Sequence, residues 1–190
     1  MQSWRSVVTE DIKVFCLVHS RKGLFKYLYY PDFRAVMIFR LSQLMYKNKL
    51  TRPLSYLLTM FNDLVTGVWI GPRVSAGPGL FLGHPRGLVV NPTAKIGAYC
   101  SIMQRVTIGG PNVTIGDYVE INAGAQIISN ARGAACLNIG DNVIIGAGSM
   151  VVKDIPSGSI AVGVPAKVVK SIDLSDNWIE FRRKRNESNE

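Results

Sequence analysis

The sequence predicts a mainly β protein, a parallel β-helix preceded by a small helical region. A small aliphatic residue, often followed by glycine, returns at about every sixth position through the second half of the chain. A six-residue period is typical of a parallel β-helix, in which each coil buries its apolar positions against the next coil. Most of the 18 glycines also follow Gly67, where long charged side chains become rare. The repeating positions are Ile70, Ala76, Leu82, Leu88, Ile96, Ile102, Ile108, Ile115, Ile121, Ile127, Ile139, Ile145 and Val151.

The segment before this repeat has the pattern of helices. Asp32 follows Pro31 and is a candidate N-cap for an apolar helical pattern that begins at Phe33. Pro53 fits the first turn of a second helix, which Gly67 should end. The apolar side of this second helix carries Leu54, Leu57, Leu58, Phe61, Leu64 and Val65. We therefore expect a helical region at 1–66, a β-helix at 67–170, and a C-terminal helix with a polar tail at 171–190.

The repeat is interrupted at three places. The step from Leu88 to Ile96 is longer than six residues, which predicts a loop at 91–95. Further interruptions are expected at 111–112 and at 128–138. On this spacing His84 falls in an unbroken stretch, on a rigid turn.

Charge and cysteine usage limit the classes of partner. The formal net charge is +9, which favours anionic partners, but no nucleic-acid-binding motif is present. Cys16, Cys100 and Cys136 are widely spaced, so neither a zinc site nor a disulfide framework is predicted, and no metal is expected. A cytoplasmic protein is the simplest interpretation. No stretch is long and apolar enough to span a bilayer, although the basic N-terminal helices could contact a membrane peripherally.

Five segments carry a family resemblance: GLFLGHPRGLVVNPTAKIG, SIMQRVTIGG, IGDYVEINAGAQII, IGAGSMVVKDIP and AVGVPAKVV. Together, over roughly residues 32–170, they resemble the hexapeptide-repeat acyltransferases. The nearest branch is the serine acetyltransferase-like one, which includes O-acetyltransferases of capsule, lipopolysaccharide and exopolysaccharide synthesis. The resemblance implies a left-handed β-helix, a homotrimer, and acetyl-CoA bound between neighbouring β-helices; pairing of two trimers into a dimer of trimers is left open.

His84 is the candidate catalytic residue. Without the resemblance, a lone histidine in a glycine-rich turn is more often structural than catalytic. The family, however, places its general base at the position of His84 in LGHPRG. A neutral imidazole can remove the proton of an attacking hydroxyl near neutral pH. The chain's other histidine, His19, lies in the helical region and is expected to be structural.

The sequence also offers candidate residues that bind the acceptor, from their chemistry, and acetyl-CoA, from the resemblance. Backbone N–H groups at Gly109 and Gly110 are candidate donors to the tetrahedral oxyanion. Trp69, Arg86 and Arg105 are candidates for the acceptor site. The expected acetyl-CoA contacts are Gly109, Gly110, Ala123, Gly146, Pro165, Ala166 and Lys167.

Three departures from serine acetyltransferase bear on the acceptor. Trp69 and Gly83 stand where that enzyme has aspartates, and no histidine follows the TIGG segment. These departures favour an acetyltransferase that acts on a hydroxyl of a glycan or glycan precursor. Serine O-acetyltransferase, a metal-dependent β-helix hydrolase and a non-catalytic β-helix binding module are the alternatives. A single histidine in the repeat region cannot supply the several ligands that the hydrolase needs.

Overall fold

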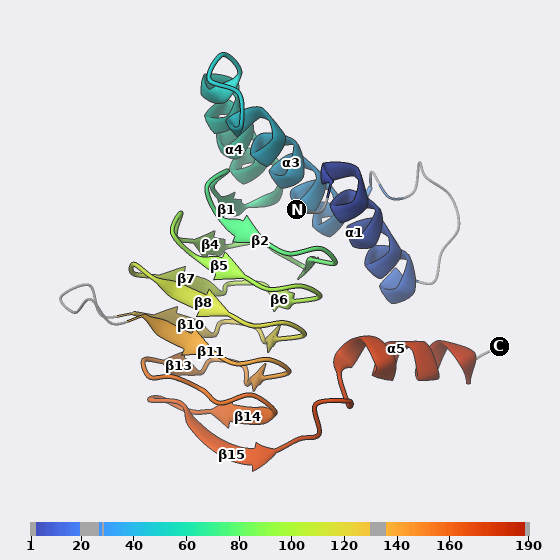
Figure 1. The fold of residues 1–190 in the computed structure, drawn as a ribbon, viewed down its shortest axis with the longest axis vertical. Coiled ribbons are helices and arrows are strands. Elements are labelled where there is room, and N and C mark those ends of the chain that lie inside the picture. The colour runs from blue at the N-terminus through green and yellow to red at the C-terminus, as the bar shows by residue number, and fades with distance from the viewer. Residues whose placement is uncertain (1–2, 20–26, 28, 130–135, 189–190) are drawn as a thin grey trace.

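The structure is a computed structural model that describes residues 3–19, 27, 29–129 and 136–188. The chain folds into helices followed by a parallel β-solenoid (Figure 1). The expected fold class, a parallel β-helix after a helical region, is confirmed. Part of the helical region (20–26) and most of the predicted loop at 128–138 lie outside the described residues. None of the described helices is long and apolar enough to cross a membrane.

Three sheets form the sides of the solenoid. Each of the first four coils contributes one short strand to each sheet, and aliphatic side chains of these strands point inward. The five-stranded sheet contains β1 (Val68–Ile70), β4 (Leu88–Val90), β7 (Thr107–Gly109), β10 (Gln126–Ile128) and β13 (Met150–Val151). The four-stranded sheet contains β2 (Ser75–Ala76), β5 (Lys95–Ile96), β8 (Val113–Ile115) and β11 (Leu137–Ile139). The six-stranded sheet contains β3 (Phe81–Gly83), β6 (Ser101–Met103), β9 (Glu120–Ile121), β12 (Ile144–Ile145), β14 (Ser159–Val162) and β15 (Lys167–Ser171), the last strand antiparallel to its neighbour.

The strand register corrects one prediction about the repeat. The sequence pattern assigned the inward position to Leu88 and the first loop to 91–95. Val90 occupies that position instead, because it pairs with Ile108 in the next coil, and a regular six-residue step leads from Val90 to Ile96. Leu88 is buried as well, which is why the sequence pattern could not tell the two apart. The predicted loop at 91–95 is therefore wrong, and the two additional residues precede β4.

The helices cap the N-terminal end of the solenoid. They are α1 (Trp4–His19), α3 (Pro31–Tyr46) and α4 (Arg52–Thr66), and α4 ends at Gly67, which has a φ of +74°. Pro31 lies in the first turn of α3, but the N-cap is Tyr30 and no side chain caps the helix. Asp32 is buried, and its Oδ2 lies 2.8 Å from Nε2 of His19. The prediction that Asp32 caps the helix is therefore wrong, because its carboxylate pairs with α1.

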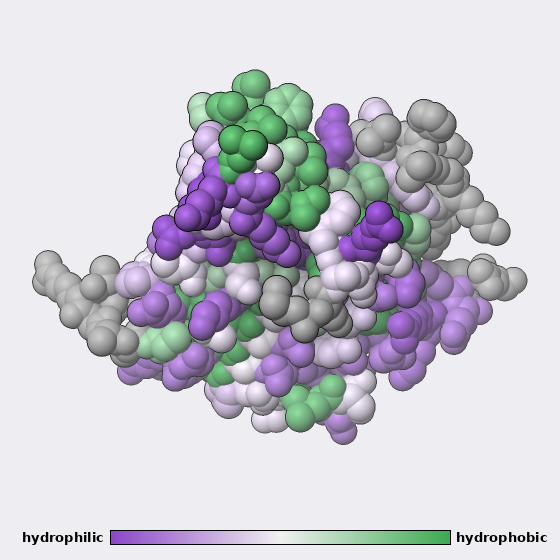
Figure 2. Space-filling model, turned by 45° about the horizontal axis from the view of Figure 1, so that its top comes forward, coloured by the Kyte–Doolittle hydropathy of each residue, from purple (hydrophilic) through white to green (hydrophobic). Residues whose placement is uncertain are grey.

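Helix α4 packs on α3 through its polar side. Ser55, Thr59, Asn62 and Thr66 are buried, and Asn62 donates a hydrogen bond to the carbonyl oxygen of Ala35 at 3.1 Å. The apolar side of α4 faces outward, and Figure 2 shows hydrophobic residues gathered over this end of the molecule. We call this surface the α4 apolar face. Its exposed members are Leu54, Tyr56, Leu57, Met60, Phe61 and Leu64.

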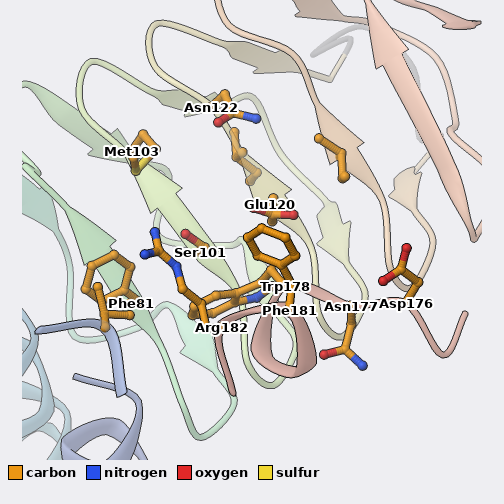
Figure 3. Close-up of a pocket in the computed structure, with 13 residues that line it drawn as sticks. Phe81, Ser101, Met103, Glu120, Asn122, Asp176, Asn177, Trp178, Phe181 and Arg182 are labelled. Atoms are coloured by element: carbon orange, nitrogen blue, oxygen red, sulfur yellow. The ribbon is translucent and has the colours of Figure 1, made fainter. Parts of the chain in front are cut away.

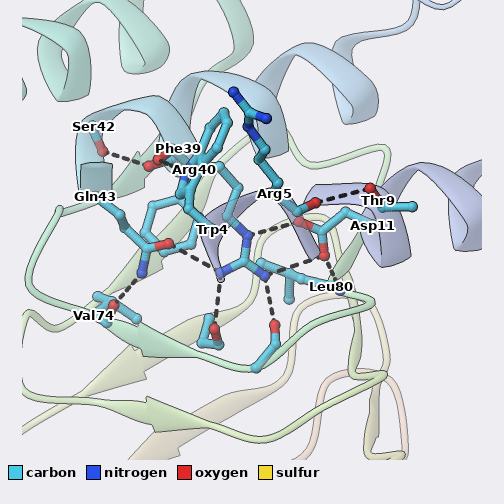
Figure 4. Close-up of polar contacts among 12 residues, drawn as sticks. Trp4, Arg5, Thr9, Asp11, Phe39, Arg40, Ser42, Gln43, Val74 and Leu80 are labelled. Carbon is cyan, nitrogen blue, oxygen red and sulfur yellow. Dashed lines mark hydrogen bonds and ion pairs between the residues drawn. The ribbon is translucent and has the colours of Figure 1, made fainter. Parts of the chain in front are cut away.

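A buried ion pair fastens the helices to the first coil (Figure 4). The Arg40 guanidinium donates hydrogen bonds to both carboxylate oxygens of Asp11, at 2.7 and 3.2 Å. It also donates to the carbonyl oxygens of Ala76 at 2.9 Å and Gly77 at 2.5 Å. Asp11 in turn accepts a hydrogen bond from the backbone N–H of Leu80 at 2.9 Å. Elements from α1, α3 and the first coil thus meet at one guanidinium.

The C-terminal helix α5 (Trp178–Glu187) turns back across the outer face of the six-stranded sheet (Figure 1). The Trp178 indole N–H donates a hydrogen bond to the carbonyl oxygen of Tyr99 at 2.7 Å. The Asn186 side chain donates to the carbonyl oxygen of Leu17 at 2.9 Å, which joins α5 to α1. Both ends of α5 are therefore tied to the rest of the chain.

Candidate active site

The site lies along one edge of the solenoid, where the chain turns from the six-stranded sheet into the five-stranded sheet. The turns of successive coils stack on one another through backbone hydrogen bonds. Arg105 N–H donates to the Arg86 carbonyl oxygen at 3.1 Å, and Gly124 N–H donates to that of Gln104 at 2.9 Å. We call this column of turns the His84 edge, because His84 stands at its first turn.

The turn that carries His84 is longer than the turns stacked on it. The chain uses two more residues between the inward positions Leu82 and Val90 than the next coil uses between Ile102 and Ile108. His84 follows directly after β3 and is exposed, with a φ of +48°. A residue with a side chain rarely adopts this left-handed conformation, and such strained positions cluster at functional sites. The longer turn therefore carries an imidazole that solvent and a ligand can reach.

A pocket of about 450 Å³ opens beside His84. It brings together four of the residues predicted from the sequence, since Arg86, Arg105 and Ala123 line it together with His84. The two guanidinium groups make this pocket cationic. Arg105 has a φ of +57°, so this side chain too is carried by a left-handed turn. The pocket therefore combines one titratable base with two cations on a rigid edge.

Sequence reasoning missed Gln104 and Gly124, which also line this pocket. The Gln104 Oε1 atom is buried and accepts no hydrogen bond from the described residues. A buried acceptor without a donor carries a desolvation penalty that a bound ligand can relieve. Gln104 directly precedes Arg105 in SIMQRVTIGG. The repeat spacing therefore places it one coil from His84, which is the sequence signal that could have identified it.

Beyond Ala123 the His84 edge is bare of large side chains. A Cβ added at Gly148 would meet no heavy atom within 4 Å, and one added at Gly124 would only reach Gly148, at 4.0 Å. Gly146 differs, because a Cβ there would lie 2.6 Å from a methyl carbon of Val162. The glycine at 146 is therefore required by packing, whereas Gly124 and Gly148 leave an open strip along the surface.

The remaining predicted residues lie away from the His84 pocket in the single chain. Gly109 ends β7 and Gly110 follows it, at the opposite end of that strand from Arg105, and a Cβ on Gly110 would lie 2.5 Å from the carbonyl oxygen of Ser129. Trp69 is 44% exposed on the outer face of β1 and does not line the pocket.

The terminal segment Pro165, Ala166 and Lys167 lies at the C-terminal end of the solenoid. The Ala166 N–H donates to the carbonyl oxygen of Met150 at 2.8 Å, which ties this segment to β13. Lys167 begins β15 and is exposed. No group of three or more potential metal-ligating side chains is present within the described ranges.

Comparison with known proteins identifies the class to which this fold and site belong. No family model matches the chain. A serine acetyltransferase from Synechococcus elongatus is 38% identical over 157 residues, which cover 79% of this chain and 62% of the relative. A serine acetyltransferase from Helicobacter pylori strain J99 is 36% identical over 152 residues, which cover 75% of this chain and 83% of the relative.

Solved structures agree with these relatives. The serine acetyltransferase of Brucella abortus superposes with a TM-score of 0.78 at 29% identity, covering 90% of this chain and 70% of that one. The Neisseria gonorrhoeae enzyme, solved in complex with serine, gives a TM-score of 0.77 at 34% identity, covering 88% of this chain and 69% of that one. The protein is thus a hexapeptide-repeat acyltransferase. Within that class, the chain belongs to the serine acetyltransferase family.

These comparisons overturn one prediction from the sequence. The expected acetylation of a glycan is wrong, because the similar proteins are serine acetyltransferases across most of this chain's length. The prediction rested on the missing carboxylates at Trp69 and Gly83 and on the missing histidine after the TIGG segment. These three departures say little about the acceptor, because other side chains, such as Gln104 and Arg105, line the same pocket from the next coil.

Proposed function

We propose that this chain catalyses transfer of an acetyl group from acetyl-CoA to the hydroxyl of L-serine, with His84 as the general base. The observation that carries the proposal is the widened turn at the His84 edge. It presents the single histidine of the repeat region to a cationic pocket, in a chain whose relatives are serine acetyltransferases.

The proposed chemistry follows from the properties of an imidazole. His84 accepts the proton of the serine hydroxyl while that oxygen attacks the thioester carbonyl carbon. When the carbon–sulfur bond breaks, His84 returns the proton to the departing thiolate. Arg86 and Arg105 attract the serine carboxylate, for which guanidinium groups are the preferred partners. Gln104 Oε1 accepts a hydrogen bond from the serine ammonium, which satisfies its buried acceptor.

The open strip beyond Ala123 supports a site for acetyl-CoA. An elongated ligand needs an uninterrupted surface, and Gly124 and Gly148 leave one beside the His84 pocket. Lys167, beyond the end of this strip, would attract the ligand's phosphates. The oxyanion donors Gly109 and Gly110 remain a prediction, and within a homotrimer a neighbouring chain could present them.

The test is steady-state turnover of L-serine with acetyl-CoA. His84→Ala should lower kcat by about 10²–10⁴-fold, the usual contribution of a general base, with little change in KM. Lys184 is exposed on α5, so Lys184→Ala is the matched control and should have the kcat of the wild type. Full activity of His84→Ala would refute the role of His84. A wild-type chain that does not acetylate serine would refute the choice of acceptor.

We further propose a cytoplasmic homotrimer whose trimers pair through the α4 apolar face. Six large apolar side chains are exposed together on one helix face, and such contiguous apolar patches mark interaction sites. A second copy covers such a face without any additional partner, since an isologous contact buries the same patch twice. The alternative is that a membrane surface covers this face. The mass of a lysine variant of α4 and its binding to anionic vesicles distinguish the two.

A further inference from the structure

A second pocket, of about 310 Å³, lies between α5 and the outer face of the six-stranded sheet (Figure 3). We call it the α5 pocket. It shares no lining residue with the His84 pocket, and the proposed function does not use it. Its lining residues are Val18, Phe81, Ser101, Met103, Glu120, Ile121, Asn122, Ile144, Asp176, Asn177, Trp178, Phe181 and Arg182.

Glu120 supplies a carboxylate to the floor of this pocket. It lies on β9 with its side chain outward, next to the inward-facing Ile121. Within the described part of the chain, the Glu120 carboxylate forms no ion pair or hydrogen bond. Burial raises the pKa of this carboxyl, and the charge of Arg182 opposes the rise. An acid held in this environment gains from a cationic partner.

Arg182 supplies the opposite charge from α5. Figure 3 shows Arg182 and Glu120 over the same part of the sheet, with Ser101 near them. The guanidinium acts electrostatically on Glu120, yet the two groups form no ion pair within the 4.0 Å limit that defines one, and Arg182 has no other salt bridge among the described residues. A nearby but unpaired acid and base leave room for a ligand that carries both charges side by side.

One part of the remaining wall is apolar, beside the polar side chains of Ser101, Asn122 and Asn177. Phe81 and Trp178 meet with ring centroids 6.1 Å apart, while Phe181 and Met103 face the same space (Figure 3). Aromatic rings and methionine favour contact with an aliphatic, aromatic or thioether side chain. Asp176 adds a second carboxylate among the lining residues.

We propose that the α5 pocket binds an α-amino acid with an apolar side chain, at a site separate from the active site. Glu120 binds the ammonium group and Arg182 binds the carboxylate. Phe81, Met103 and Trp178 hold the side chain. Serine, whose side chain is small and polar, leaves these walls uncovered, so the pocket selects a different amino acid from the proposed acceptor.

The experiment is isothermal titration calorimetry on the full chain with L-methionine, L-leucine and L-phenylalanine as probes. At least one should bind at concentrations up to roughly 10 mM. Glu120→Gln and Arg182→Gln should each weaken that binding by about tenfold or more, because each removes one charge-assisted contact. Arg183→Gln is the matched control on α5, since Arg183 pairs with Glu180 at 2.6 Å, and it should bind normally.

Modified probes separate direct contact from damage to the fold. N-Acetyl-L-methionine lacks the ammonium group, so its affinity for Glu120→Gln should equal its affinity for the wild type. L-Methioninol lacks the carboxylate, so its affinity for Arg182→Gln should equal its affinity for the wild type. His84→Ala should leave binding of all three probes unchanged. The proposal is overturned if none of the three binds, or if the Glu120 and Arg182 variants bind as well as the wild type. A chain that acetylates serine but binds none of the probes would refute this inference alone.

Discussion

Replacing Arg40 by methionine tests the contact that fastens the helices to the solenoid. Arg40 is 1% exposed, and its guanidinium donates to Asp11, Ala76 and Gly77. Methionine fills much of the volume but donates no hydrogen bond. Asp11, which is 2% exposed, then keeps a buried negative charge with only backbone N–H groups, at Leu80 and Gly79, among the donors that the described residues supply.

The expected cost follows from this loss. Breaking a buried ion pair by removing one partner costs about 3–5 kcal/mol. For a chain of this size, each kcal/mol lowers the melting temperature by roughly 2–4 °C, so Arg40→Met should melt about 6–20 °C below the wild type. Because the chain is expected to be oligomeric, both proteins are compared at one protein concentration by circular dichroism. Arg183→Met is the control, since its exposed pair with Glu180 should be worth about 0–1 kcal/mol.

The pH dependence of this difference is a further check. Burial raises the pKa of Asp11 in the folded chain, while Arg40 opposes the rise. In Arg40→Met the opposing charge is gone, so the folded carboxyl should take up its proton at a higher pH than the unfolded one. A raised folded pKa means that folding gains stability as the pH falls through it toward the unfolded value. The loss of unfolding free energy in Arg40→Met, relative to the wild type, should therefore become smaller between pH 7 and about pH 5. The stability that Asp11→Asn restores in the double variant should become smaller over the same range. A loss no larger than that of Arg183→Met, or one independent of pH, would refute this account.

Three further predictions concern the site, the thiols and the assembly. Ala123→Leu should raise the KM for acetyl-CoA by about tenfold or more while kcat changes less, because the added side chain enters the His84 pocket; an unchanged KM would remove Ala123 from the acetyl-CoA site. Iodoacetamide should label Cys136, which is exposed, and spare Cys100 in the folded chain, because burial raises the pKa of the Cys100 thiol to about 12; mass spectrometry of the labelled protein reports both. Leu57→Lys with Leu64→Lys should halve the mass of a dimer of trimers in analytical ultracentrifugation, and an unchanged mass combined with lost binding to anionic vesicles would favour the membrane instead.

The solenoid could be predicted because its physics is local and repeated. Each coil must direct a small aliphatic side chain inward at each side, so the spacing along the chain reports the structure directly. The prediction failed where two inward residues compete. Leu88 and Val90 are both buried on β4, and only pairing with the next coil shows which one continues the column. The sequence therefore found the turn that carries His84 but not its additional length.

The helical region shows a different limit. A hydrophobic stripe on a helix is usually assumed to mark its buried side. On α4 the buried side carries Ser55, Thr59, Asn62 and Thr66, which allow close approach to α3, while the leucines face outward. The periodicity located the two sides correctly, but which side meets the rest of the chain depends on tertiary packing.

The acceptor could not be predicted from the residues next to His84, and the reason is geometric. In a β-solenoid, the neighbours of a side chain come from the coils above and below, roughly twenty positions away in the sequence. Gln104 and Arg105 reach the His84 pocket from the next coil, and Ala123 reaches it from the coil after that. A missing carboxylate at Gly83 therefore removes one candidate partner for serine without showing that the pocket lacks another. The acceptor is determined by the whole column of turns along the His84 edge, and residues adjacent in sequence to the base describe only one of them.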